Sequence, residues 1–417
     1  MFSKRYRVFD SMEFISNLYN VAMHIVLQFE KPSDVQRALK EVLSCHNAFH
    51  TKGIVFWGEA NDDIPIYKIP SEIKELHEIP NWMYHAHPYS IRQRMGTIAC
   101  DDTRLAILIN HSTGDGDYCL RFVEHLCNPE EHWEMPQCPH SPDEEFKAQI
   151  QAQPITNPFC AADPNLSRIL PKNKDDYKTR HFENYYFTLP INQIKGYSEK
   201  DHSVHSISEN MWRSLLLPFF ILPSECQNGN FHSISTVFNM RRLLPKEKVN
   251  HSMQNFIAAM PVSASPDEKT SLKEFGEMMR NDFNRGLREG NLFSHLKTCW
   301  EGVYRPWRRP TAPGVAIEMS SMGPVKISGP VKDAFVTLTC NDKKDIGSIS
   351  LLTYAADNEN TGGERKFIGQ MQYNTGEISA PECEAFTKEV IYAMTNFDDN
   401  MTVGEALNEL RNFQKKQ

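Results

Sequence analysis

The segment His111-Ser112-Thr113-Gly114-Asp115-Gly116 contains residue types that could move a proton. Because an imidazole titrates near neutral pH, His111 could accept a proton from a hydroxyl or an amine. The glycines of the segment permit close backbone approach and unusual torsions. Asp115 could orient the histidine or hold a distant cation, and either Asp115 or Asp117 could instead cap a following helix. Because a histidine and an aspartate at this spacing often occur by chance, the pattern alone leaves these alternatives open.

A buried strand and an amphipathic helix are predicted on the two sides of this segment. Arg104–Asn110 is a short, nearly continuous apolar run, which is typical of a strand covered on both faces. After Gly116, apolar side chains recur at helical spacing, at Cys119, Phe122, Val123 and Leu126. We therefore expect His111 on a strand-to-helix connection, where rigid elements can hold a catalytic group.

The N-terminal region predicts a second strand and helix. Val21–Phe29 is rich in apolar and β-branched residues and is expected to be a strand. Lys31–Asp34 follows as a turn that contains helix-capping residues. Apolar residues then recur at helical spacing, which predicts a helix ending near His46. This order of strand, turn and helix is typical of an α/β or α+β layer.

The second half of the chain predicts another mixture of strands and helices. Three of its strands are expected to belong to one sheet, with a helix packed on that sheet. The strands of that sheet would be Ala334–Thr339, Ile349–Tyr354 and Phe367–Tyr373, and its helix would be Cys383–Met394. Further strands or apolar stretches are Tyr185–Leu189, Ser233–Phe238 and Phe256–Val262, and further helices are Ile207–Leu222 and Leu272–Leu287.

The stretch between Asn128 and Thr179 differs from the rest of the chain in composition. It has eight prolines, dense charge and no apolar periodicity. A segment of this length without a regular pattern is unusual inside a compact domain, so it predicts a crossover between two lobes. The expected organisation is an N-terminal lobe over residues 1–135, a linker over 136–180 and a C-terminal lobe over 181–417.

The composition is that of an ordinary globular protein. Among the 417 residues, 40% are hydrophobic and 24% are charged, with a net charge of −8. This mild acidity argues against general nucleic-acid binding. The ten cysteines form no CxxC pair, which favours reduced thiols over a disulfide framework or a zinc ribbon. With no apolar leader and no run of about 18 apolar residues, no transmembrane segment is expected, and the expected location is cytoplasmic.

Leu105–Leu126 matches throughout a pattern in which HxxxDG follows a buried strand and precedes a helix. In this respect the chain resembles the superfamily of chloramphenicol acetyltransferase-like enzymes, which includes plant-type HxxxD acyltransferases, fungal alcohol acetyltransferases and the condensation domains of peptide synthetases. Further segments resemble family motifs in the expected order, namely Ala38–His50, Asn239–Arg241, Gln254–Phe256 and Ser320–Gly323. The last is closest to fungal-type alcohol acetyltransferases, and the resemblance spans roughly residues 10 to 410.

The resemblance implies both a fold and a reaction. The fold would be α/β (α+β), with two chloramphenicol acetyltransferase-like lobes, each a mixed sheet with helices, and an active-site channel between them. A hydroxyl or amine would attack an acyl-CoA cosubstrate such as acetyl-CoA, with His111 as general base and no acyl-enzyme. Asp115 would be structural and would pair with Arg241 of the Asn-x-Arg motif. Gly116 would keep the loop tight, and neighbouring amides could help to bind the oxyanion.

Additional candidates for oxyanion or substrate contacts are Ser320, Ser321 and Asn255. A hydroxyl of either serine could stabilise an oxyanion, or the two could form a polar turn before Gly323. The sequence also departs from the family pattern. Asn110 stands where many members carry a further histidine, Ser321 stands where the fungal pattern has asparagine, and the plant-type DFGWG motif is absent.

Two other groups of residues could bind ligands. Lys297 and the arginines that follow it, interleaved with aromatics, could hold the phosphates of CoA or could be solvated surface charges; these arginines are Arg305, Arg308 and Arg309. His85-Ala86-His87 could imitate a zinc site together with His111 if it lay on a strand. Because no carboxylate partner is evident, no metal site is expected there. His125 and His132 are interpreted as ordinary helix and linker residues.

The expected partner is a small-molecule alcohol or amine, and the expected state is a monomer without a permanently bound cofactor. Two alternatives stay open. The acyl donor could be bound to a carrier protein instead of CoA, in a condensation or ester-forming reaction. The chain could also be a non-catalytic binding protein on the same fold, an idea motivated by Asn110 and Ser321.

Overall fold

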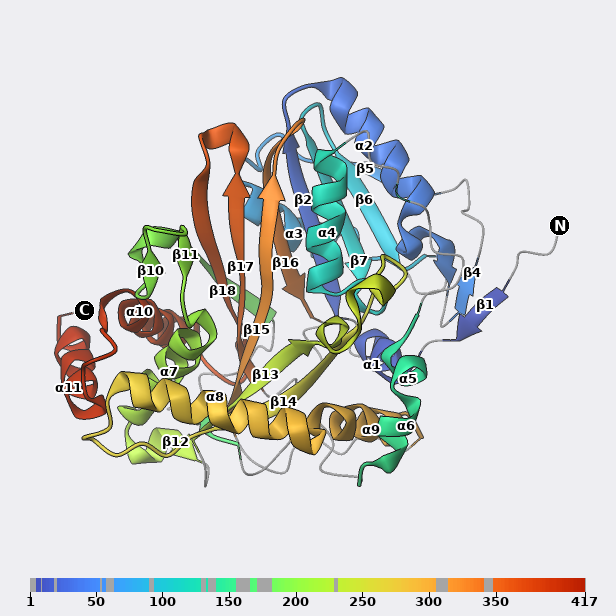
Figure 1. The fold of residues 1–417 in the computed structure, drawn as a ribbon. Helices are drawn as coiled ribbons and strands as arrows, with labels where there is room; N and C mark the ends of the chain where they lie inside the picture. Colours follow the sequence, from blue (N-terminus) through green and yellow to red (C-terminus); the bar gives the residue numbers. More distant parts are fainter. Residues whose placement is uncertain are drawn as a thin grey trace.

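Two large β-sheets with helices packed against them dominate the part of the chain that the structure describes (Figure 1). One sheet has five strands and the other has eight, and both contain parallel as well as antiparallel pairs. The α/β fold with mixed sheets is therefore confirmed. The computed structural model describes residues 5–8, 10–18, 21–52, 55–57, 64–89, 94–128, 133, 140–154, 166–170, 182–228, 232–304, 314–340 and 348–416.

The five-stranded sheet contains the strand that leads into the HxxxD segment. Its central strands β2 (Ala22–Phe29) and β7 (Arg104–Asn110) pair antiparallel and are almost wholly buried, as their mostly apolar sequences predict. The helices α2 (Pro32–Cys45) and α4 (Gly116–Cys127) contribute apolar side chains to the same core. The strand order is β16 (Val331–Thr339), β2 (Ala22–Phe29), β7 (Arg104–Asn110), β6 (Gly96–Cys100) and β5 (Ile66–Lys68).

Strand β16 joins this sheet from the C-terminal part of the chain. It pairs antiparallel with β2, so the prediction that it shares one sheet with the two following strands is wrong. Those strands, β17 (Ser348–Asn358) and β18 (Glu364–Asn374), pair with each other in the larger sheet. An apolar pattern reports that a strand is buried but does not identify the strand beside it. The chain thus passes from β15 (Val315–Ile327) of the larger sheet to β16 of the smaller sheet, which joins the two sheets covalently. In the smaller sheet, β16 is hydrogen-bonded to β2.

The larger sheet is organised around β15 (Val315–Ile327), which pairs in parallel with both β17 and β13. The middle of β15 was considered as a polar turn, but it is a strand with an irregularity between Ser321 and Pro324. Such a bulge lets polar residues occupy a strand that is otherwise buried. The remaining strands are β8 (Arg168–Ile169), β9 (Phe182–Pro190), β12 (Gln227–Asn228), β13 (Ser233–Asn239) and β14 (Ile257–Ser263).

The predicted helices, which correspond to α2, α4, α7, α8 and α10, begin and end close to the expected positions, whereas the other helices were not predicted. The N-termini of α8, α10 and α11 have capping boxes, in which a serine or threonine and a glutamate three residues later satisfy free backbone amides. The helices are α1 (Ser11–Leu18), α2 (Pro32–Cys45), α3 (Ile79–Ala86), α4 (Gly116–Cys127), α5 (Pro142–Glu145), α6 (Lys147–Ala152), α7 (Ile207–Phe220), α8 (Leu272–Glu289), α9 (Asn291–Tyr304), α10 (Ala380–Asn396) and α11 (Val403–Gln414). Small strands are β1 (Arg5–Val8), β3 (Thr51–Lys52), β4 (Val55–Trp57), β10 (Tyr197–Ser198) and β11 (Ser203–Val204).

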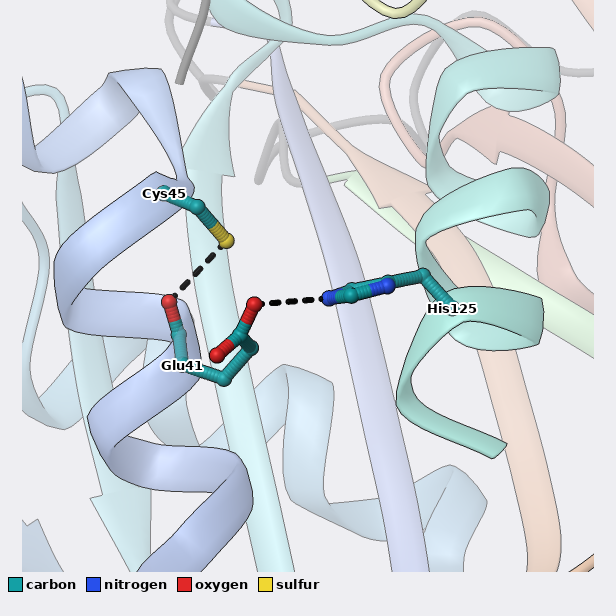
Figure 2. A group of neighbouring side chains, drawn as sticks. All are labelled: Glu41, Cys45 and His125. Carbon is teal, nitrogen blue, oxygen red and sulfur yellow. Dashed lines mark hydrogen bonds and ion pairs between the residues drawn. The ribbon is translucent and has the colours of Figure 1, made fainter. Parts of the chain in front are cut away.

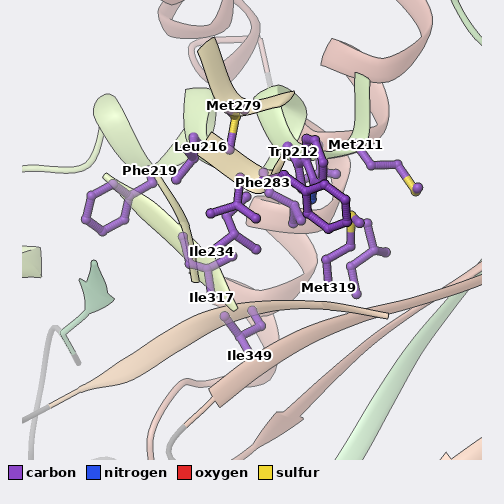
Figure 3. Close-up of a cluster of buried hydrophobic side chains, with 14 of the residues drawn as sticks. Met211, Trp212, Leu216, Phe219, Ile234, Met279, Phe283, Ile317, Met319 and Ile349 are labelled. Carbon is purple, nitrogen blue, oxygen red and sulfur yellow. The ribbon is translucent and has the colours of Figure 1, made fainter. Parts of the chain in front are cut away.

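Each large sheet has its own hydrophobic core. In the core of the larger sheet, α7 and α8 pack their apolar faces on β13, β15 and β17 (Figure 3). Trp212 of α7 lies at its centre and donates a hydrogen bond from Nε1 to Thr236 Oγ1 at 3.0 Å. The ring therefore supplies a large apolar area without leaving its polar atom unpaired. This packing holds β13, whose end leads into the site described below.

The proline-rich stretch contains short elements where the structure describes it, namely α5, α6 and β8. Other parts of the range 136–180 lie outside the described residues, and the lobe boundaries stay a prediction. No helix among the described residues has both the length and the apolarity needed to cross a bilayer.

Candidate active site

The HxxxD segment lies at the junction between β7 and α4, as predicted. Residues His111–Thr113 form a 3-10 turn after the last residue of the strand, Asn110. The Asn110 side chain accepts a hydrogen bond from Ser112 N at 2.9 Å and donates one to Tyr89 Oη at 2.7 Å. Its backbone carbonyl accepts from Thr113 Oγ1 at 2.8 Å. Asn110 therefore shapes the turn that carries His111.

Hydrogen bonds on both sides fix the backbone of His111. Its amide donates to Val21 O at 2.8 Å, and its carbonyl accepts from Asn255 Nδ2 at 2.9 Å. The residue is only 8% exposed. Burial lowers the pKa of His111, while the charge of Asp115 and the histidine's own backbone carbonyl act in the opposite direction. The imidazole is therefore mostly neutral at pH 7, the state in which it can accept a proton.

Asp115 is fully buried, and its carboxylate bonds to groups other than the imidazole. One oxygen caps α4 by accepting from Tyr118 N at 2.9 Å. The other accepts from Arg241 Nη1 at 2.8 Å and from Phe256 N at 2.7 Å. The helix-cap and ion-pair alternatives for Asp115 are thus both present in the structure. Both carboxylate oxygens are therefore paired with groups of the protein itself, as a buried charge requires.

Arg241 is as buried as its partner, with a side chain only 2% exposed. Its guanidinium also donates from Nε to Met253 O at 3.1 Å and from Nη1 to Asn239 Oδ1 at 3.1 Å. Asn239 is the first residue of the Asn-x-Arg motif, so that motif orients its own arginine. The structure therefore brings Asp115 and Arg241 together as a buried ion pair with several supporting acceptors.

The segment Gln254–Phe256, just before β14, runs along the HxxxD segment. Asp115 N donates to Gln254 O at 2.7 Å, and Gln254 Oε1 accepts from Asn47 Nδ2 at 2.9 Å. Asn255 donates to the carbonyl of His111, and its Oδ1 is buried without a hydrogen-bond partner among the described residues. The amide nitrogen of Asn255 is thus committed to holding the turn. Sequence reasoning had placed this residue near an oxyanion or substrate, and had not identified this bond.

Gly116 marks a close approach between α4 and β15. A Cβ atom at this position would lie 2.3 Å from Cγ of Met322. Only glycine leaves room for that contact. Ser320 and Ser321 precede Met322 on the same strand, half-buried and exposed respectively. The structure therefore brings the strand of these serines against the start of α4.

The remaining candidates do not join this group in the described part of the chain. Arg305, Arg308 and Arg309 lie outside the described residues. Lys297 donates from Nζ to Gln151 O at 2.9 Å and so binds to the end of α6. His85-Ala86-His87 does not lie on a strand, which was the condition for a zinc site there, because these residues lie in and just after α3, which Pro80 helps to start.

Comparison with known proteins supports the fold but does not assign a function. No family model matches the sequence, and no curated protein matches it significantly. Among solved structures, the chain is similar to polyketide synthase associated protein 5 from Mycobacterium tuberculosis, at 14% identity and a TM-score of 0.60 over 95% of this chain and 100% of that one. It is also similar to the starter condensation domain of rhizomide synthetase, in a complex with C8-CoA, at 12% identity and a TM-score of 0.61 over 96% and 97% of the two chains.

A third similar structure is the epimerization domain from the third module of tyrocidine synthetase B, at 12% identity and a TM-score of 0.60 over 100% of this chain and 98% of that one. At these identities the likeness shows the fold alone. That fold is the condensation-domain-like fold of the chloramphenicol acetyltransferase type, as the sequence pattern predicted.

Proposed function

We propose that this protein is an acyltransferase that moves an acyl group from a thioester to the hydroxyl or amine of a small acceptor. The observation that carries the proposal is the placement of His111. Its imidazole is kept neutral by burial, and its backbone is fixed by Val21 and Asn255. Asp115 is saturated by other partners, so His111 acts as the general base without a carboxylate hydrogen-bonded to its ring.

The reaction follows from the geometry of the ring. Asn255 Nδ2 lies 3.5 Å from Nδ1 of the ring, and in the tautomer that carries its proton on Nδ1 the other nitrogen, Nε2, accepts a proton. As Nε2 takes the proton of the acceptor, the oxygen or nitrogen attacks the thioester carbonyl and forms a tetrahedral intermediate. Collapse of the intermediate breaks the carbon–sulfur bond, and the imidazolium returns the proton to the departing thiolate. No acyl-enzyme is needed, since both substrates react directly.

The start of α4 is proposed to bind the negative charge of that intermediate. Backbone amides near Gly116 lie at a helix N-terminus, whose dipole favours an anion. The hydroxyls of Ser320 and Ser321 are proposed as further donors, because Met322 on the same strand contacts the Gly116 position. In this account Asp115 and Arg241 position the loop and do not touch substrate.

We propose acyl-CoA as the donor and keep a carrier-protein-bound acyl group as the alternative. A solved neighbour of the same fold is a starter condensation domain in complex with C8-CoA, which supports a CoA thioester. Another neighbour is the epimerization domain from the third module of tyrocidine synthetase B, and such a modular synthetase favours the alternative of a carrier-bound donor. A monomer is sufficient, because the residues of the proposed site all come from one chain.

The test is thioester turnover. Free thiol release should be followed with acetyl-CoA, longer acyl-CoAs and an acylated carrier protein against a mixed panel of alcohols and amines. Turnover with free CoA esters supports the leading proposal, and turnover restricted to the carrier supports the alternative. No turnover with either donor would favour a binding protein on this fold. Each assay includes His111→Ala, checked by circular dichroism for an intact fold.

A further inference from the structure

Three side chains of metal-ligating type meet between α2 and α4, outside the HxxxD segment (Figure 2). Glu41 and Cys45 lie one turn apart on the same face of α2, and His125 reaches them from α4. One ligand atom from each residue lies within 4.8 Å of the others. We propose that Glu41, Cys45 and His125 form a zinc site. No metal site was predicted from the sequence, in which Cys45 and His125 are far apart and were not considered together.

The donor set selects the kind of metal. A carboxylate oxygen, a thiolate sulfur and an imidazole nitrogen are all zinc ligands, whereas magnesium and calcium prefer oxygen alone. Zinc bond lengths imply separations of about 3.3–3.7 Å between ligand atoms in a tetrahedral site. The ligand atoms, which lie within 4.8 Å of one another, would have to adjust to that spacing when zinc binds, and the Glu41 side chain, which is 36% exposed, has room to move. That exposure also leaves a fourth position for water.

The imidazole of His125 is already oriented toward the other two residues. Its ring lies 5.1 Å from that of Trp133 and 5.9 Å from that of Phe122, and the residue is only 3% exposed. These rings limit the rotation of the imidazole and hold Nε2 toward α2. A ligand fixed before binding loses little conformational freedom when the metal arrives.

Without metal, the three groups satisfy one another in pairs. His125 Nε2 lies 2.8 Å from Glu41 Oε1, and the Cys45 thiol donates to the backbone carbonyl of Glu41 at 3.0 Å. A hydrogen-bonded pair beside an ordinary helical cysteine is therefore the competing account of the same contacts. The two accounts differ in whether the thiol becomes a thiolate when zinc is added.

Zinc binding requires a defined movement of protons. Burial, together with the carboxylate of Glu41, raises the pKa of the Cys45 thiol, and a bound cation reverses that effect. On binding, the thiol loses its proton to solvent, and the imidazole coordinates through Nε2 with its proton on Nδ1. Because Nδ1 has no hydrogen-bond partner among the described residues, the outer support typical of tight sites is missing. A micromolar affinity that increases with pH follows.

The position of the site suggests a structural role for the metal. α4 begins at Gly116, directly after Asp115, and α2 ends just before Asn47, which bonds to Gln254. A metal that joins α2 to α4 would hold together two helices that flank the proposed active site. Zinc should therefore stabilise the folded chain, and Tm should rise with zinc concentration.

The experiment uses the full chain, reduced and freed of metal by a chelator that is then removed. Cobalt is added first, because a cobalt–thiolate bond gives a charge-transfer absorption band that zinc then displaces. Calorimetry with zinc in buffers of different ionisation enthalpy measures the released proton. We expect the band, micromolar zinc affinity and proton release in the wild type, and loss of the band in Cys45→Ser.

Two variants separate the metal site from the hydrogen-bonded pair. Glu41→Gln can still accept a hydrogen bond from His125 but is a poorer ligand, so zinc affinity should fall at least about tenfold while the metal-free Tm stays near that of the wild type. Cys127→Ser, on α4 outside the group, should bind zinc like the wild type. Absence of the cobalt band in the wild type, or a band of full intensity in Cys45→Ser, would overturn the proposal.

Discussion

The side-chain amide nitrogen of Asn255 lies 2.9 Å from the backbone carbonyl oxygen of His111. Asn255 belongs to the segment before β14 of the larger sheet, whereas His111 follows β7 of the smaller sheet. The bond therefore joins the proposed base to the other half of the molecule. Phe256 N also donates a hydrogen bond to the carboxylate of Asp115. The adjacent residues Asn255 and Phe256 therefore hold the histidine and the aspartate of the HxxxD segment, respectively.

Asn255→Ala should lower kcat with little change in KM, because Asn255 positions the histidine and does not bind substrate in this account. The variant also leaves a buried carbonyl without its donor, so the free energy of unfolding should fall by about 1–3 kcal/mol. Steady-state kinetics and denaturant unfolding measure both effects. Asn408→Ala, at an exposed position of α11, is the control. A raised KM with unchanged kcat would instead identify Asn255 as a substrate contact.

The Asp115–Arg241 ion pair should show strong coupling in a double-mutant cycle. Asp115→Asn or Arg241→Gln alone leaves a buried charge without its partner and should cost about 3–5 kcal/mol of stability. The double variant should lose less than the sum of the two single losses. Unfolding in urea gives all the values needed. Additive losses would show that the two residues stabilise the protein independently.

Gly116→Ala should destabilise the protein by about 1–3 kcal/mol, because the added methyl group would overlap Met322. Met322→Ala alone creates a cavity and should also destabilise. The combination should be more stable than the sum of the two effects predicts, since the space vacated at 322 accepts the new methyl group. Thermal unfolding of the set of variants measures this. A Gly116→Ala variant as stable as the wild type would argue against the contact.

The sequence predicted the elements around the site better than their arrangement. The β7–His111–α4 unit could be predicted because its strand and helix patterns are local and strong. The pairing of Asp115 with Arg241 was predicted from the resemblance of their segments to family motifs, because no periodicity relates residues so far apart in the sequence. β16 was assigned to the wrong sheet, because several strands share the same apolar composition and the sequence does not show which of them are paired. The approach of Glu41 and Cys45 to His125 depends on helix packing alone.

Acid should destabilise the folded chain below about pH 6.5, the range in which unfolded histidines gain protons. Burial lowers the pKa of both His24 and His46 to about 3, and that of His295 to about 4. Because the unfolded state binds these protons first, stability is fully present above pH 6.5 and is lost as pH falls toward the folded values. Denaturant unfolding from pH 8 to pH 5 should show this decline, and His46→Leu should make it shallower. A constant stability over that range would contradict the prediction.

The central claim, that His111 is the general base, is tested most directly by the pH dependence of kcat/KM. Burial lowers the pKa of His111 below its usual value of 6.5. The active form is the neutral imidazole, so kcat/KM should be constant at neutral pH and should fall only at acid pH, with an apparent pKa below 6.5. His111→Ala, with its fold intact, should lose turnover at every pH. Turnover in that variant with the same acid decline as the wild type would show that another group accepts the proton.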